Sequence, residues 1–244
     1  AVMIPKFYPD ALADDALSAL RFLQQREDID PKQIGFWGSS EGGMLATYVA
    51  SHSEDTAFAI NSSGFMGPFW ETLRYQVGSI LRAQGVPEAE IEEEIALADL
   101  WLQVARTGKG FEQFQKLKRE TIKSDGSWFF QWRGEFDSLK QLRWDWEHVL
   151  SFDPLPALAK VTCPVLAVFG ELDVLTDAAA ASENMRRVLT KAGHKDFAVK
   201  TFPNAGHSLS VMPSKDRMAP GVFETLRTWL LERVQVAESI GHRE

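Results

Sequence analysis

The sequence predicts an α/β protein whose mostly parallel sheet is interrupted by a long helical segment. Three observations support this class. Short, continuously apolar runs recur along the chain, and strands that are buried on both faces of a parallel sheet have this composition. Helical patterns separate these runs, as the connections between parallel strands require. Finally, the residues from about 65 to 150 carry helical patterns without any strand-like run.

The first part of the chain alternates between helix and strand. The run "QIGFWG" at 33–38 is a short strand, and its apolar residues on both faces indicate an interior position in the sheet. A helix is expected to begin near Glu41, and "AFAINSS" at 57–63 is typical of a second buried strand. Before these strands, residues 10–26 form an amphipathic helix whose apolar stripe consists of Leu12, Ala16, Ala19, Leu20 and Leu23.

Prolines and glycines mark the helices of the middle segment. A proline opens and a glycine closes each of the first two, at Pro68 and Gly85 and at Pro87 and Gly108. Two further helices are expected near 110–123 and 136–150. The acidic run "EAEIEEE" falls in the first turns of the second helix, where carboxylates favour the helix dipole, so we do not interpret it as a metal site.

The last part of the chain returns to strands and helices. Strand-like runs lie at 163–173 and 196–207, and helices are expected at 178–192 and 220–237. We therefore divide the chain into an α/β core, formed by residues 1–66 and 151–244, and a helical cap formed by residues 67–150.

Composition excludes several classes of function. The 244 residues are 45% hydrophobic and carry a net charge of −8, so the surface would repel a nucleic acid. The single cysteine, Cys163, allows no disulfide within the chain. No apolar run is long enough for a membrane span, and the first residues show no signal peptide. No pair of histidines or cysteines has metal-ligand spacing. We expect a cytoplasmic protein without cofactors.

A small-residue motif follows the first predicted strand. In "GFWGSSEGG", at 35–43, Ser40 stands between Gly38 and Gly42, on a tight turn from strand to helix. Glycines there would remove Cβ atoms that collide across the turn, and the backbone N–H of Glu41 could stabilise an oxyanion. We interpret Ser40 as a nucleophile. The alternative is a glycine-rich turn with an N-capping serine, for which Ser39 is the better candidate.

A serine nucleophile needs a histidine to take its proton and a carboxylate to orient that histidine. Both are expected at the carboxyl ends of later strands. Asp173 ends the third strand and His207 follows the fourth, whereas Glu171 and Asp177 are competing acids and Asp177 could simply cap the next helix. The other histidines, which have weaker positions, are His52, His148, His194 and His242.

Three segments carry a resemblance to a known family. They are "DALADDALSALRFLQQREDIDPKQIGFWGSSEGG", "FDPLPALAKVTCPVLAVFGELD" and "FPNAGHS". The chain resembles bacterial α/β-hydrolase fold proteins of the carboxylesterase and serine-aminopeptidase-like kind. The resemblance implies that Ser40 is the nucleophile, Asp173 the acid and His207 the base. It also implies that the helical insertion is a lid over the acyl pocket.

The chain departs from this family before the nucleophile. The family has several strands there and draws a second oxyanion donor from them, whereas only 39 residues precede Ser40 here. The strand at 33–38 would then be an unpaired edge. We expect an upstream segment or a second chain, as in a homo-oligomer, to complete the sheet.

The leading functional hypothesis is a serine hydrolase that cleaves a carboxylic ester with a hydrophobic or aromatic acyl group. Six of the eight tryptophans lie in the predicted cap, although aromatic residues also build ordinary cores. A peptide hydrolase of the aminopeptidase type is the close alternative, and an acidic cap residue facing the pocket would favour it. A third hypothesis is a non-catalytic assembly module that retains the triad as a relic and binds partners at the sheet edge.

Overall fold

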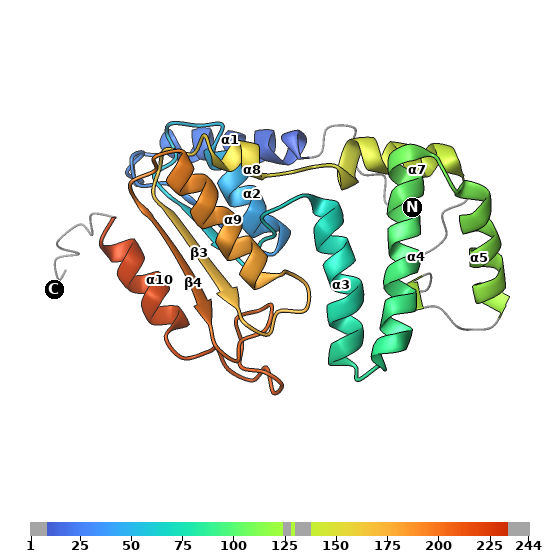
Figure 1. Ribbon diagram of the computed structural model, residues 1–244. Coiled ribbons are helices and arrows are strands. Elements are labelled where there is room, and N and C mark those ends of the chain that lie inside the picture. The colour runs from blue at the N-terminus through green and yellow to red at the C-terminus, as the bar shows by residue number, and fades with distance from the viewer. Residues whose placement is uncertain (1–8, 124–127, 130–137, 234–244) are drawn as a thin grey trace.

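The computed structural model describes residues 9–123, 128–129 and 138–233 (Figure 1). Four parallel strands form its sheet, in the order in which they occur along the chain. The predicted α/β class and the mostly parallel sheet are confirmed. The strands are β1 (Phe36–Ser39), β2 (Ala59–Ser62), β3 (Val165–Gly170) and β4 (Phe197–Phe202).

Helices cover both faces of this sheet (Figure 1). One face packs against α2 (Glu41–Ala50), α8 (Leu155–Leu158) and α9 (Ala178–Lys191), and α1 (Asp10–Gln24) lies against α2. The other face packs against α10 (Val222–Leu231). Every residue of β3 is buried, and alternate residues belong to the two hydrophobic clusters, as expected for an interior parallel strand.

The segment between β2 and β3 is helical, as predicted. It contains α3 (Phe69–Ala83), α4 (Glu88–Thr107), α5 (Phe111–Lys123), α7 (Leu139–Asp145) and a short π-helical turn, Trp146–Leu150. Its helices stand beside the sheet, with α3 nearest to it (Figure 1). They bury a hydrophobic cluster of their own, which includes Trp101, Phe114 and Leu142.

The predicted helix boundaries in this segment are largely correct. Helices α3 and α4 begin directly after Pro68 and Pro87, and Gly108 ends α4 in the left-handed conformation that glycine adopts without strain. The helix expected near 136–150 begins at Leu139, and residues 136 and 137 lie outside the described residues. Trp132, one of the six tryptophans of the predicted cap, also lies outside them.

Strand β1 lies at the edge of the described sheet, as the sequence predicted for this chain. Among the described residues no strand pairs with its outer side, and the Trp37 side chain is 59% exposed. The backbone N–H groups of Phe36 and Ser40 donate to Phe58 and Ser62, so the alternate residues Trp37 and Ser39 direct their backbone groups away from β2. The expectation that a further strand pairs with this side of β1 stays a prediction.

None of the helices in the described ranges is long and apolar enough to cross a membrane.

Candidate active site

The turn from β1 to α2 holds Ser40 in an unusual backbone conformation. Its φ is 59° and its ψ is −129°, a positive-φ geometry that a non-glycine residue rarely adopts. Ser40 immediately precedes α2, yet its side chain makes no capping hydrogen bond and it is exposed. Ser39 ends β1 and therefore does not cap α2 either. The turn thus presents the Ser40 hydroxyl rather than using it to stabilise the helix.

Of the two glycines predicted to relieve a collision at the Ser40 turn, one has that role and the other does not. A Cβ at Gly38 would lie 2.0 Å from the carbonyl oxygen of Gly42, so this glycine is required, as predicted. A Cβ at Gly42 would meet nothing within 4 Å, so the collision predicted there is wrong, because that side of α2 faces open space. Gly43 makes the close approach of α2 to the sheet, because a Cβ there would lie 2.5 Å from Asn61 Oδ1.

Sequence reasoning missed a further glycine under the turn. A Cβ at Gly64 would lie 2.3 Å from the Met44 nitrogen and 2.7 Å from the Ser40 carbonyl oxygen. The Gly64 N–H also donates to Asn61 Oδ1 at 2.7 Å. The glycine that follows "NSS" at the end of β2 is the sequence signal that could have identified this position.

Asp173 and His207 are in direct contact. Asp173 Oδ2 lies 2.8 Å from His207 Nδ1, and Oδ1 accepts hydrogen bonds from the N–H groups of Leu175 and Thr176 at 2.7 and 2.9 Å. The Asp173 residue is only 2% exposed, and these donors compensate its carboxylate for the loss of water. Because an ionised carboxylate only accepts, the His207 Nδ1–H donates, which leaves Nε2 as the proton acceptor of the ring.

The competing acids and histidines have other partners. Glu171 Oε2 accepts the Asn204 N–H at 3.0 Å, and Asp177 Oδ1 caps α9 by accepting the Ala180 N–H at 2.9 Å. The remaining histidines in the described ranges contact backbone carbonyls: His52 that of Tyr48, His148 that of Trp144, and His194 that of Cys163. His242 lies outside the described residues. Asp173 is therefore the acid that faces a histidine.

The three predicted residues all lie at the carboxyl edge of the sheet. Ser40 follows β1, Asp173 follows β3 and His207 follows β4. The loop after β2 connects these ends, because the Ser63 N–H donates to Val168 in β3 and the Ser63 carbonyl accepts the Thr176 hydroxyl at 2.8 Å. Asp173 and His207 contact one another, whereas no hydrogen bond joins the Ser40 hydroxyl to His207 within the described residues.

The sequence matches the family model described as the alpha/beta hydrolase family over residues 5–220. The chain belongs to this family. No curated protein gives a significant sequence match.

Solved structures of other alpha/beta hydrolases share the fold at low identity. An acetyl xylan esterase from Paenibacillus sp. R4 is 14% identical, with a TM-score of 0.51 over 93% of this chain and 54% of that one. The DcsB protein in complex with a substrate analogue is 14% identical, with a TM-score of 0.52 over 96% of this chain and 76% of that one. The chain spans about half the length of the acetyl xylan esterases. At this identity the similarity shows the fold alone.

Glu41 is the first residue of α2 in this alpha/beta hydrolase. The first N–H groups of a helix have no acceptor within the helix, and they point outward from its N-terminus. The Glu41 N–H therefore has no acceptor within α2 and directly follows Ser40 in the chain.

The surroundings of the Cys163 thiol lower its reactivity as a nucleophile. It is buried, and burial raises its pKa to about 11. A thiol with this pKa stays protonated at neutral pH, so it does not compete with a serine as a nucleophile. Within the described residues, no three His, Cys, Asp or Glu side chains are arranged to hold a metal ion.

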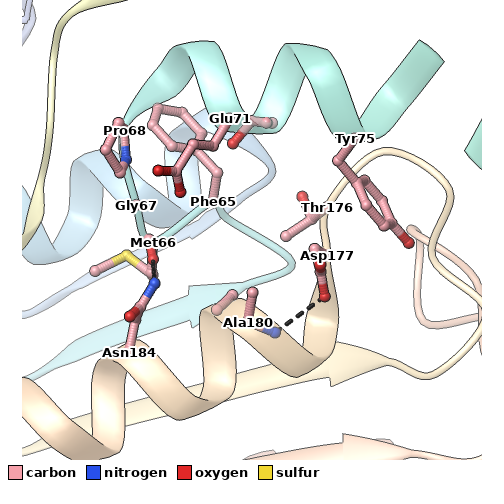
Figure 2. Close-up of a pocket in the computed structure, with 12 residues that line it drawn as sticks. Phe65, Met66, Gly67, Pro68, Glu71, Tyr75, Thr176, Asp177, Ala180 and Asn184 are labelled. Atoms are coloured by element: carbon pink, nitrogen blue, oxygen red, sulfur yellow. Dashed lines mark hydrogen bonds between the residues drawn. The ribbon is translucent and has the colours of Figure 1, made fainter. Parts of the chain in front are cut away.

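A small pocket of about 90 Å³ lies beside the Asp173 loop, between α3 and α9 (Figure 2). Glu71 and Tyr75 line it from α3, and Asp177 and Asn184 from the other wall. Neither Ser40 nor His207 lines this pocket. No sequence pattern pointed to it, because its walls come from segments that are about 100 residues apart.

Proposed function

We propose that the chain is a serine hydrolase that cleaves a carboxylic ester through an acyl-enzyme on Ser40. The observation that supports this proposal most directly is the hydrogen bond between buried Asp173 and His207. This pair lies at the same sheet edge as Ser40, which stands on a strained turn with its side chain exposed.

The proposed reaction has two steps. The Ser40 Oγ attacks the ester carbonyl carbon while its proton moves to Nε2 of His207, and the Glu41 N–H donates to the resulting oxyanion. The intermediate collapses, and the leaving alkoxide takes the proton from Nε2 and departs as the alcohol. Water then loses a proton to Nε2 and attacks the acyl carbon. When this second intermediate collapses, the acid is released and the proton passes from Nε2 to the Ser40 Oγ. Asp173 stays ionised and stabilises the imidazolium in both steps.

We further propose that residues 67–150 act as a cap over the acyl group. The aromatic residues at its centre do not support contact with the substrate, because Trp101 and Phe129 pack edge to face within the cluster of the cap itself. A hydrophobic or aromatic acyl group would instead meet partly buried side chains of this segment that lie outside that cluster.

A strand that pairs with β1 belongs to the same proposal. The outward N–H groups of Trp37 and Ser39 could form backbone hydrogen bonds with a further parallel strand. That strand would come from elsewhere in the polypeptide or from a second copy of the chain. Such a strand would also bring a second oxyanion donor near Ser40. We expect slow hydrogen exchange at these two amides in the native protein, and exchange as fast as in exposed loops would contradict the pairing.

A fluorophosphonate probe tests the proposed nucleophile. We expect intact mass to show a single adduct, which peptide mapping places on Ser40, and we expect no adduct in Ser40→Ala. Ser39→Ala is the matched control, because it removes the same atoms from the neighbouring exposed serine and should still be labelled. A wild-type protein that stays unlabelled would favour the non-catalytic assembly module.

One observation favours peptide hydrolysis as a second candidate function. Glu71, an acidic residue of the helical insertion, lines the pocket beside the Asp173 loop, where a carboxylate could bind the α-ammonium group of a peptide (Figure 2). Under this hypothesis Glu71→Gln raises KM for an aminoacyl p-nitroanilide and leaves KM for a p-nitrophenyl ester unchanged. Equal kinetics of wild type and Glu71→Gln on the anilide would remove this candidate.

A further inference from the structure

Helix α3 of the insertion makes three side-chain hydrogen bonds to the loop that carries Asp173. The Tyr75 hydroxyl donates to the Asp173 carbonyl at 2.7 Å. The Ser79 hydroxyl lies 2.7 Å from the Val174 carbonyl and 2.8 Å from the Tyr75 carbonyl of its own helix, and its one proton is shared between them. The Gln76 amide donates to the Leu175 carbonyl at 2.8 Å. Three consecutive carbonyls are thus bound by three side chains from one helix, almost 100 residues away in the sequence.

The conformation of this loop determines where the Asp173 carboxylate points. Asp173 Oδ1 accepts the N–H groups of Leu175 and Thr176, so the side chain closes a turn with its own loop. This fixes the other oxygen, Oδ2, toward His207 Nδ1. Any shift of the backbone at 173–175 therefore changes the orientation of the carboxylate, and with it the position of the imidazole.

The inward and outward sides of the loop are both occupied. Its N–H groups bind the Asp173 carboxylate on one side, and its carbonyls bind α3 on the other. Burial raises the pKa of Tyr75, with a further contribution from the charges of Asp177 and Asp173. The phenol therefore remains a protonated donor over the pH range in which a serine hydrolase works.

We propose that Tyr75, Gln76 and Ser79 are positioning residues, which hold Asp173 against His207 by fixing the carbonyls of residues 173–175. This inference rests on the proposed function for its kinetic consequence, although its structural part concerns only the Asp173–His207 hydrogen bond. It also makes α3 a fixed part of the site.

The test combines Tyr75→Phe with Ser79→Ala, which removes two hydroxyl groups and keeps the rest of both side chains. We expect kcat to fall about 10- to 100-fold while KM changes less than about twofold, because small misplacements of reacting groups have effects of this size. The low-field proton NMR signal of His207 Nδ1–H, assigned by its absence in a His207 variant, should weaken or broaden. The single variants should each show a smaller effect.

The matched control combines Tyr48→Phe with Ser18→Ala. The Tyr48 hydroxyl in α2 donates to Asp10 in α1 at 2.6 Å, and the Ser18 hydroxyl donates to the Asp14 carbonyl within α1 at 2.8 Å. The control therefore removes two hydroxyl groups and their hydrogen bonds, as the test variant does, but away from the Asp173 loop. It should retain wild-type kcat and an unchanged His207 signal.

The outcomes separate this inference from the proposed function. A double variant that keeps wild-type kcat and an unaltered His207 signal overturns the positioning role, even if hydrolysis depends on Ser40. Hydrolysis that survives in Ser40→Ala overturns the proposed function, whereas the NMR signal still tests the three bonds. If the double variant unfolds, Tyr75→Phe alone decides in the same way, because a phenylalanine fills the same space.

Discussion

The loop that carries Asp173 and the turn that carries Ser40 leave the same edge of one sheet, yet their surroundings differ. The Asp173 loop is buried and hydrogen-bonded on both sides, by its own carboxylate and by α3. Ser40 stands at the edge of the described sheet with its side chain exposed, and only its backbone is held, by the turn and by hydrogen bonds to Ser62, Gly43 and Met44. A reactive group is thus positioned in two ways: by a network of polar contacts at Asp173, and at Ser40 by a tight backbone turn that a side chain at Gly38 would block.

The nucleophile end should respond most strongly to a change of chemistry. Ser40→Ala removes the hydroxyl, and we expect hydrolysis of a short p-nitrophenyl ester to fall to background. The thermal transition should move little, because the Ser40 side chain makes no capping hydrogen bond that alanine would lose. If Ser40→Ala kept most of the wild-type activity, Ser40 would be excluded as the nucleophile.

Replacing one oxygen of the Asp173 carboxylate with an NH₂ group should remove most of the hydrolytic activity. In Asp173→Asn an amide NH₂ faces His207 Nδ1, which holds the imidazole in the wrong tautomer. The known size of this effect, about 10⁴-fold in kcat, comes from a chymotrypsin-type enzyme. Asp177→Asn is the matched control, because asparagine caps a helix as well as aspartate does. If Asp177→Asn is the more damaging change, Asp173 is not the acid.

Much of this site could be predicted from the sequence, because its signals are local. Gly38 and Ser40 belong to one turn, and Asp173 and His207 each follow an apolar run directly. The prolines before α3 and α4 and the glycines after them likewise allowed both helices to be located in the sequence. These features depend on backbone conformation and burial, which short stretches of sequence determine.

The parts that could not be predicted depend on contacts across the fold. Tyr75 and Asp173 are 98 residues apart, and a tyrosine on a helix gives no sign of which carbonyl it will meet. The strand expected to pair with β1 stays a prediction for a related reason. An apolar strand indicates that something covers it, but not which part of a polypeptide does so.

The steric restriction at the Ser40 turn can be tested through stability. Gly38→Ala places a Cβ 2.0 Å from the Gly42 carbonyl oxygen and 2.8 Å from the Gly43 nitrogen, both backbone atoms that cannot rotate away. We expect the free energy of unfolding in urea to fall by about 3 kcal/mol, at the upper end of the usual cost of overpacking. Reactivity with the fluorophosphonate probe should fall as well, because relief of the clash displaces Ser40.

The smallest expected effect is that of Gly42→Ala, which should raise the free energy of unfolding, whereas Gly38→Ala lowers it. A Cβ at Gly42 meets nothing within 4 Å, and the residue lies in the first turn of α2 without a positive φ. Alanine loses less backbone entropy than glycine when a helix forms, so Gly42→Ala should raise the free energy of unfolding by about 0.5–1 kcal/mol. Urea unfolding of Gly42→Ala and Gly38→Ala side by side gives the measurement. Equal destabilisation by the two substitutions would mean that the turn tolerates no side chain at either glycine, and that steric restriction is not specific to Gly38.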